Sequence, residues 1–484
     1  MQHDLPKDLT QDGTGTVLLY SIHRTEDWFR HLGENMGFAK SAVVSCLPGE
    51  GDHNVIADFQ HHQRRFYAAD ARHSDLLDAA TVADIAARCR VLRFMGDRRA
   101  AAMILGMAEA MAKVLDVVQP DVIVSFPIDR YVSDVLEHLG RARGVPFYEL
   151  TVSALNGQSM LMRKGALCQH GPDPDPALVE AGVEEMATPL FKPSYVQGVA
   201  NFTAKRWLKV FAYFRLRGFV FWLISLLHRD RLNLHYLDAQ SFLGHKPRLS
   251  DMRIVNLVDR DWRDSLDAFP KDRRLFIGLA LFPEASIDYW IHDLKLIEYE
   301  DVIVEMATAF SDAGYLVLVK DHPLQFGFRQ CGLIDRLRAI KNVKFVPYEE
   351  NGTELLTLCG VSFTCTGTLG LQAALLGAKS IVVENYYTTD TRDFIFLSDR
   401  DRIKDLPEEA SSRDFSTGLE DRQRRIIANL LRGSFVSDFF SFEKFDKTNP
   451  SPGATELGHV LGREVRALMA EEASAATRRS VDGA

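Results

Sequence analysis

The sequence has few cysteines and no long apolar run. Its cysteines are scattered through 484 residues without a C-x-x-C pair, which argues against a disulfide framework or a cysteine-based zinc site. The longest strongly apolar stretch near the middle, residues 218–227, has about half the ~20 residues that a membrane-spanning helix needs. The first fifteen residues are polar and lack the apolar region of a signal peptide. We therefore expect a cytoplasmic protein with reduced thiols. The six cysteines are Cys46, Cys89, Cys168, Cys331, Cys359 and Cys365.

The sequence also lacks an excess of positive charge. Its net charge is −9 and its pI is about 5.9, which argues against nucleic acid as a partner bound through a global basic field. No G-x-G-x-x-G follows the first expected strand, and there is no Walker motif. Asp173 and Asp175 form a D-x-D between prolines in an expected loop, and His61 and His62 have no second group of ligands nearby in the sequence. We therefore expect no bound metal and no cofactor.

Two runs of alternating strand and helix patterns fill most of the chain. Apolar segments rich in β-formers occur at 16–22 and 121–126, with amphipathic stretches after them. The same alternation restarts after residue 270, with strand patterns at 274–281 and 315–320. Strands that are apolar on both faces and alternate with helices are typical of parallel sheets covered on both sides. The pattern predicts an α/β fold of two tandem, doubly wound, Rossmann-like domains.

The composition between and after these runs suggests the domain limits. We predict an N-terminal domain at 1–245, a C-terminal domain at 246–470 and a disordered tail at 471–484, which is small and polar. Residues 201–231, within the first domain, are basic and heavily aromatic. Such a segment fits a helix that lies on an anionic membrane surface, or core helices between the domains with a basic outer face. Both interpretations stay open from the sequence.

Polar side chains follow the strand at 315–320, where "LVLVKDHP" ends in a charged pair and a His-Pro turn. Lys320 and His322 stand at the carboxyl end of this strand, and Pro323 fixes the backbone of the turn. In a parallel sheet, ligands bind beyond the carboxyl ends of the strands. A lysine and a histidine that converge there suit an anion, most simply a phosphate. A solvated loop with an incidental histidine is the alternative.

A second polar stretch follows the strand pattern "VSFTC". Thr366, Gly367 and Thr368 lie where a helix is expected to begin, so hydroxyls and backbone N–H groups would face a bound phosphate. Gly367 and Gly370 would let the backbone and a ligand come close. An ordinary threonine cap is the alternative. Glu284, after the first strand of this half, could accept hydrogen bonds from sugar hydroxyls or simply begin a helix after Pro283.

Taken together, these motifs resemble the capsular polysaccharide biosynthesis glycosyltransferases, the group that contains the bacterial Kdo transferases. The resemblance is carried by P-E-x-S at 283–286, K-x-H-P at 320–323 and T-G-T-x-G at 366–370, within about residues 275–385. It implies a GT-B fold in which the C-terminal domain holds a nucleotide sugar and the N-terminal domain holds the acceptor. It also implies that His322 and the Thr366/Thr368 hydroxyls contact the nucleotide phosphate, and it favours a CMP-linked sugar such as Kdo.

A transfer reaction that inverts the configuration at the reacting carbon of the sugar needs a base to take the proton of the acceptor hydroxyl. Asp129, after the strand at 121–126, is the first candidate, and His23, after the strand at 16–22, is the second. Lys320, His322 and Thr368 would stabilise the departing phosphate without a metal ion. The resemblance also implies that the acceptor is a surface polysaccharide or a lipid-linked glycan. A position at the inner face of the plasma membrane would follow if residues 201–231 lie on a membrane.

Three other functions remain open from the sequence. A polyol-phosphate transferase of the teichoic-acid type would also use a His-Pro turn and a hydroxyl pair. A sugar-nucleotide 2-epimerase would need several acid and base groups in its site and no acceptor. A non-catalytic subunit of glycan assembly would bind a nucleotide or a polysaccharide for a partner.

Overall fold

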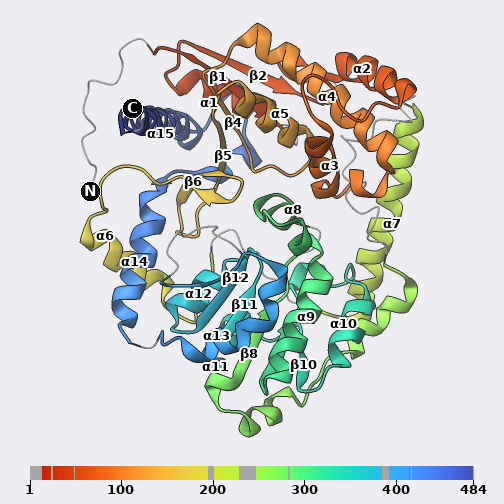
Figure 1. The fold of residues 1–484 in the computed structure, drawn as a ribbon, viewed down its shortest axis with the longest axis vertical. Helices are drawn as coiled ribbons and strands as arrows, with labels where there is room; N and C mark the ends of the chain where they lie inside the picture. The colour runs from red at the N-terminus through yellow and green to blue at the C-terminus, as the bar shows by residue number, and fades with distance from the viewer. Residues whose placement is uncertain are drawn as a thin grey trace. The chain divides into compact units, whose positions relative to one another are not determined.

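Two units of the chain are each built around a mainly parallel β-sheet (Figure 1). The computed structural model describes residues 13–22, 25–47, 49–193, 201–227, 247–281, 284–383, 392–415 and 417–482. Unit 1 takes residues 1–86, 95–172 and 432–484, and unit 2 takes residues 87–94 and 173–431. This division differs from the predicted limits of 1–245 and 246–470, because segments that are distant in the sequence fold into one unit.

The sheet of unit 1 has a parallel centre and an antiparallel edge. In chain order its parallel strands are β1 (Thr16–Ser21), β2 (Lys40–Ser45), β3 (His53–Asn54), β4 (Val122–Ser125) and β5 (Phe147–Val152). The spatial order is β14-β6-β5-β4-β1-β2-β3. At the edge, β6 (Gln158–Arg163) runs antiparallel to β5, and β7 (Ala166–Leu167) and β14 (Ser434–Val436) pair with it. Every residue of β4 is buried, as expected for a central strand between two helical layers.

Six helices belong wholly or largely to unit 1. They are α1 (Glu26–Asn35), α2 (Ile56–Ala69), α3 (Ala79–Arg88), α4 (Asp97–Val118), α5 (Tyr131–Ala142) and α15 (Pro452–Asp482). Helix α15, from the end of the chain, lies beside α1 (Figure 1), and a Cβ on Gly458 would be 2.7 Å from the Asn35 Cβ. Further along α15, Glu472 accepts a hydrogen bond from the Tyr148 hydroxyl at 3.1 Å. The helix runs to Asp482, which differs from the predicted disordered tail at 471–484.

The sheet of unit 2 is parallel throughout. Its strands are β8 (Arg274–Gly278), β9 (Leu316–Lys320), β10 (Val343–Val346), β11 (Val361–Thr364), β12 (Lys379–Val383) and β13 (Ile395–Leu397). Their spatial order, β10-β9-β8-β11-β12-β13, is the strand order of a Rossmann fold. Alternate residues of β9 enter different apolar clusters, with Val317 and Val319 in one and Leu316 and Leu318 in the other. The predicted fold class, two Rossmann-like α/β domains, is confirmed.

The helices of unit 2 connect its strands and extend the unit at both ends. They are α6 (Pro176–Met186), α7 (Ala204–Leu227), α8 (Ala285–Trp290), α9 (Tyr299–Asp312), α10 (Cys331–Arg338), α11 (Gly352–Leu358), α12 (Leu369–Leu375), α13 (Leu406–Ser412) and α14 (Leu419–Arg432). Helix α7 covers most of the basic aromatic segment at 201–231 and belongs to unit 2, not to the N-terminal domain as predicted. Within the described parts of the chain, no helix combines the length and the apolar character needed to cross a membrane.

Candidate functional site

Three neighbouring strands of unit 2 carry the predicted phosphate-binding motifs at their carboxyl ends. Strand β8 lies between β9 and β11, and the chain leaves β8 toward β9 on one side and returns to β11 on the other. Lys320 ends β9, Glu284 follows β8, and Thr366 follows β11. Parallel α/β sheets bind ligands at the carboxyl ends of two neighbouring strands whose connections leave in opposite directions. The structure therefore brings all three motifs to one edge of one sheet.

Two hydroxyl groups join the first turn of α8 to the loop after β11. The Ser286 Oγ and the Thr366 Oγ1 are 2.7 Å apart, and both residues are buried. Buried hydroxyls that bond to each other are held in fixed positions, and each keeps further capacity for a hydrogen bond. Ser286 was visible in the sequence only as the last position of the P-E-x-S motif. Its partnership with Thr366 makes it a member of the candidate site.

The threonine and the glycines at the start of α12 have separate roles. Thr368 is the N-cap residue of α12, and its side chain makes no capping hydrogen bond. A Cβ on Gly370 would be 2.6 Å from the Val382 Cγ1, so this glycine lets α12 pack closely on β12. The close packing of α12 on β12 therefore accounts for a glycine at position 370 without the ligand that the sequence suggested there. A Cβ on Gly367 would be 3.1 Å from the Thr364 Oγ1, with the next atom at 4.0 Å.

His322 is held with one ring nitrogen toward the backbone. Its Nδ1 accepts a hydrogen bond from the Leu324 N–H at 3.2 Å. Burial lowers the pKa of the His322 imidazole, and the nearby Asp321 carboxylate partly offsets this effect. A neutral imidazole that accepts at Nδ1 carries its proton on Nε2. His322 can therefore donate a hydrogen bond to an anion without carrying a charge itself.

Asp321, between Lys320 at the end of β9 and His322 in the turn that follows, is paired inside unit 2. Its Oδ1 is 2.8 Å from the Arg329 Nη2, its Oδ2 accepts from the Tyr348 hydroxyl at 2.5 Å, and both charged side chains are fully buried. Arg329 also donates to the Ala280 carbonyl oxygen at 2.8 Å. These bonds fix the backbone that carries Lys320 and His322. Arg329 was missed by the sequence analysis, because nothing local distinguishes it from a surface arginine.

Lys320 is more enclosed than the sequence suggested. The residue is 6% exposed, and its Nζ donates to the Asp321 carbonyl oxygen at 3.3 Å. Burial lowers the pKa of Lys320, while the carboxylates of Asp321, Glu349 and Glu350 act in the opposite direction. Its role as a phosphate ligand stays a prediction.

Glu284 lies at the start of α8 in a setting that favours its neutral form. Burial raises the pKa of the Glu284 carboxyl to about 7, the Arg90 guanidinium opposes this, and Asp288 adds to it. A carboxyl group with a pKa near neutral exists in both forms at physiological pH, so it can accept or donate a proton. From the sequence, Glu284 is either an acceptor for sugar hydroxyls or a residue that begins a helix, and in the structure it is the N-cap residue of α8.

Three arginines from the short segment at 87–94 hold α8 in place. The Arg93 Nη2 is 2.9 Å from the Asp288 Oδ1, and the Arg90 Nε is 3.3 Å from the Asp288 Oδ2. Arg88 donates to the carbonyl oxygens of Asp288 at 3.2 Å and of His292 at 2.8 Å. This segment stands between helices of unit 1 in the sequence but folds with unit 2. The spacing of these arginines was the only signal in the sequence, and their partners are about 200 residues away.

In unit 1, the first candidate base already has a partner. Asp129 follows β4, and its two carboxylate oxygens are 3.1 and 3.0 Å from the Nε and Nη2 of Arg130. Both side chains are partly buried, at 22% and 15% exposure. Asp129 would have to separate from Arg130 before it could accept a proton. His23, the second candidate, lies outside the described residues.

Glu149 is a further carboxyl group of unit 1 that the sequence analysis missed. It is fully buried in β5, and burial raises its pKa to about 7, while hydrogen bonds from the Lys164 and Ile128 N–H groups lower it. The Ile128 N–H donates to the Glu149 Oε2 at 3.1 Å, directly before Asp129. Glu149 therefore positions the loop that carries Asp129. An acidic residue inside the apolar strand pattern "FYELTV" was the available signal.

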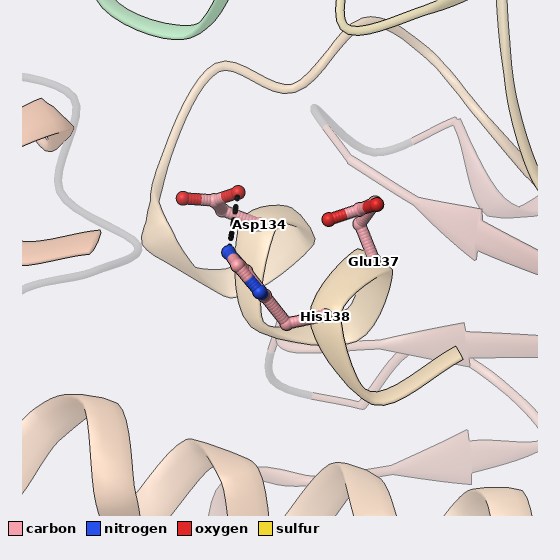
Figure 2. Close-up of side chains that lie close together, drawn as sticks. All are labelled: Asp134, Glu137 and His138. Atoms are coloured by element: carbon pink, nitrogen blue, oxygen red, sulfur yellow. Dashed lines mark ion pairs between the residues drawn. The ribbon is translucent and has the colours of Figure 1, made fainter. Parts of the chain in front are cut away.

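Among the described residues, one cluster contains three side chains of the kinds that bind metal ions. Asp134, Glu137 and His138 lie on α5 with ligand atoms within 4.8 Å of one another (Figure 2). The Lys164 Nζ is 2.9 Å from the Asp134 Oδ1 and 3.1 Å from the Glu137 Oε2. The cation between these two carboxylates is therefore a lysine ammonium group. The cluster ties the turn after β6 to α5 and gives no reason to assign a metal.

Comparisons with known proteins add the following findings. No known family model matches the chain, and no curated protein matches it. It is similar to the solved KpsC beta Kdo 2,4 transferase of Thermosulfurimonas dismutans, with 13% identity and a TM-score of 0.34 over 72% of this chain and 87% of that one. It is also similar to the UDP-GlcNAc 2-epimerase of Methanocaldococcus jannaschii, with 10% identity and a TM-score of 0.27 over 87% and 100% of the two chains. A glycosyltransferase of Rickettsia africae matches with 9% identity and a TM-score of 0.27 over 87% and 96%.

Proposed function

We propose that the chain is a glycosyltransferase of the GT-B type that transfers a sugar from a nucleotide donor to a glycan acceptor. The observation that carries the proposal is the convergence of hydrogen-bond donors at the carboxyl ends of β9, β8 and β11. His322 supplies a neutral N–H there, and the Ser286–Thr366 pair supplies hydroxyls held 2.7 Å apart. Fixed donors at the point where the strand order reverses are suited to a phosphate.

In this proposal, unit 2 binds the donor. His322, Thr366, Thr368 and Lys320 donate to the phosphate and stabilise the negative charge that develops as it departs. Glu284 contacts the sugar, where its carboxyl can accept or donate because its pKa is about 7. No metal ion is required for these roles.

Unit 1 would bind the acceptor and supply the base. Asp129 would take the proton of the attacking hydroxyl after separating from Arg130, and His23 is the second candidate. Transfer would invert the configuration at the reacting carbon of the sugar, because in a single displacement the acceptor hydroxyl attacks the face opposite to the departing phosphate. The donor is a CMP-linked sugar, Kdo or a related acidic sugar, and the acceptor is a surface polysaccharide or a lipid-linked glycan. These last two assignments rest on the resemblance of the sequence motifs.

A panel of nucleotides tests the proposal through thermal stability. A ligand that binds only the folded state at a hundred times its Kd stabilises it by about 2.7 kcal/mol. We expect CMP to raise the Tm of the chain more than CDP, UDP or GDP at equal concentrations. Thr366→Val should reduce this shift, because it removes one hydroxyl of the site, and one hydrogen bond contributes about 0.5–1.5 kcal/mol. Thr308→Val, which removes a hydroxyl from α9 in the same unit, is the matched control and should retain it.

The results separate the two parts of the proposal. A larger shift with UDP or GDP would reject the CMP donor and keep the site. A folded chain whose Tm is unchanged by every nucleotide would reject the site itself.

A sugar-nucleotide 2-epimerase is the second candidate function. Two groups at the carboxyl ends of the strands favour it. The Glu284 carboxyl, with a pKa of about 7, can take up or release a proton, and the His322 imidazole can donate a hydrogen bond. Such an enzyme would exchange the proton at C2 of a UDP-sugar with solvent in the absence of any acceptor. Loss of the C2 proton signal in D2O, followed by NMR, would favour this candidate over glycosyl transfer.

A further inference from the structure

Helix α7 is fixed to unit 2 along one face. Trp207 is fully buried and belongs to the apolar core of the unit. One turn further on, Val210 approaches Gly327 so closely that a Cβ on that glycine would be 2.8 Å from the Val210 Cβ. The ring of Phe214 is 4.7 Å from the ring of Phe328. These positions are three and four residues apart, so they form one stripe of the helix.

The other face of α7 is apolar and exposed. Nine of its large apolar side chains are 38% to 73% exposed, and they are half of the 18 such side chains found among the described residues. Scattered apolar residues are normal on a protein surface, whereas a contiguous group marks a place of contact. The nine residues are Leu208, Tyr213, Leu216, Phe219, Val220, Trp222, Leu223, Leu226 and Leu227.

The same helix is the opposite in charge to the chain as a whole. The chain has a net charge of −9, yet α7 contains no acidic residue and five basic ones: Lys205, Arg206, Lys209, Arg215 and Arg217. Lys205 and Lys209 are exposed. At helical spacing they share a stripe with Leu216, Leu223 and Leu227, away from Trp207 and Phe214. The exposed face is therefore cationic at its start and apolar toward its end.

We propose that this face of α7 binds the surface of a membrane rich in anionic lipids and lies in the interface without crossing it. Cations beside an apolar stripe suit the boundary between headgroups and acyl chains. The negative charge of the rest of the chain would be repelled by the same surface, which leaves α7 as the side that faces it. The consequence that the acceptor is a lipid-linked glycan rests on the proposed function, but the binding itself does not.

The charge of the face argues against a second copy of the chain as the occupant. A two-fold contact places the same surface patch of both copies together. A parallel pair of α7 helices would bring the basic residues of the two copies together, and an antiparallel pair would set them against the apolar end of the other copy. Neither arrangement neutralises their charge. An acidic protein partner would satisfy the charge, and the experiment below distinguishes it from lipid.

Trp222 provides a direct readout. It is 54% exposed, whereas Trp28, Trp207 and Trp262 are at most 1% exposed and Trp290 is largely covered. Insertion of α7 into the interface should shift the fluorescence emission of Trp222 to shorter wavelength. Trp222→Phe removes the reporter and should abolish the shift while the chain still sediments with vesicles.

The test uses the full chain with vesicles of phosphatidylglycerol and of phosphatidylcholine. We expect binding to phosphatidylglycerol at low salt, a marked loss at high salt, and little binding to phosphatidylcholine. Each cation near such a surface contributes about a fivefold increase in affinity, so Lys205→Gln with Lys209→Gln should weaken binding about 25-fold. Lys295→Gln with Lys404→Gln removes the same charge from exposed sites elsewhere in unit 2 and should have little effect.

Several results would overturn the proposal. They are failure of the wild type to bind phosphatidylglycerol at low salt, equal binding to phosphatidylcholine, and an equal effect of the two lysine pairs. A dimer that dissociates when Leu223 and Leu227 are changed to Ser would show that the face joins two copies. Because the lysine changes are at exposed side chains, they test the face even if the leucine variant unfolds. Vesicle binding without any Tm shift by nucleotides would reject the proposed function and leave this proposal standing.

Discussion

The two units share a strand order but differ in what stands at the carboxyl edge of their sheets. The parallel parts read β3-β2-β1-β4-β5 in unit 1 and β10-β9-β8-β11-β12 in unit 2, which is the same topology. In unit 2, the charge of Asp321 is matched by a buried arginine, and His322, Ser286 and Thr366 present donors. In unit 1, Asp129 is matched by the adjacent Arg130, which is partly exposed. The topology thus fixes where a ligand can bind, and the pairing of charges decides which groups remain to bind it.

The largest expected effect concerns the two aspartate–arginine pairs. Removing one partner of a buried pair leaves an uncompensated charge and costs about 3–5 kcal/mol. We therefore expect Arg329→Met to lower the free energy of unfolding by about this amount, measured in urea. Arg130→Met should cost less than this, because the two side chains of that pair are 15% and 22% exposed and solvent can compensate part of the charge left on Asp129. The double variant Asp321→Asn with Arg329→Met should recover part of the loss, and equal losses in the two units would contradict the comparison.

The second prediction tests whether His322 acts on a ligand or only on its own loop. His322→Ala should lower turnover by about ten- to a thousand-fold, the usual effect of losing one donor to a developing negative charge. His322→Asn keeps an acceptor for the Leu324 N–H but loses the Nε2 donor, so it should be equally impaired while unfolding like the wild type. His459→Ala, an exposed histidine of unit 1, is the control. Recovery of activity in the Asn variant would reduce His322 to a structural cap.

The third prediction compares two carboxyl groups whose pKa is raised, one in each unit. Burial raises the pKa of Glu149 and of Glu284 from 4.5 to about 7 in the folded chain. Between these values the folded state binds more protons than the unfolded state, so stability should fall as pH rises from about 4.5 to about 7 and then level off. Each group accounts for a change on the order of 3 kcal/mol, at about 1.36 kcal/mol per pKa unit.

Gln substitutions separate the two groups. Glu149→Gln and Glu284→Gln should each remove one part of this pH dependence, measured by urea unfolding at several pH values. A Glu149→Gln variant that keeps the full pH dependence of the wild type would contradict the assignment in unit 1. The same result for Glu284→Gln would contradict it in unit 2 and would weaken the epimerase candidate.

The sequence was a good guide to the strand ends of unit 2. Lys320, His322, Thr366 and Thr368 were placed correctly relative to their strands, because apolar runs and turn residues are local signals. Their convergence also followed from the sequence, since carboxyl ends of parallel strands share one edge. The sequence was a weaker guide to the hydrogen-bond and ion-pair partners of buried charged residues. Arg329 and Glu149 could not be found because their importance lies in contacts with loops that the chain reaches only after folding.

The alternation of apolar strands and amphipathic helices, read from the sequence alone, determined the α/β class, the two parallel sheets and the positions of the polar motifs on them. Only the tertiary structure decided that residues 87–94 join unit 2, that residues 432–484 return to unit 1, and that α7 is anchored by Trp207 with its other face exposed. The physical reason is the range of the interactions. Backbone hydrogen bonds and side-chain periodicity act within a few residues, whereas buried charges and apolar faces are satisfied by whichever segment packs against them.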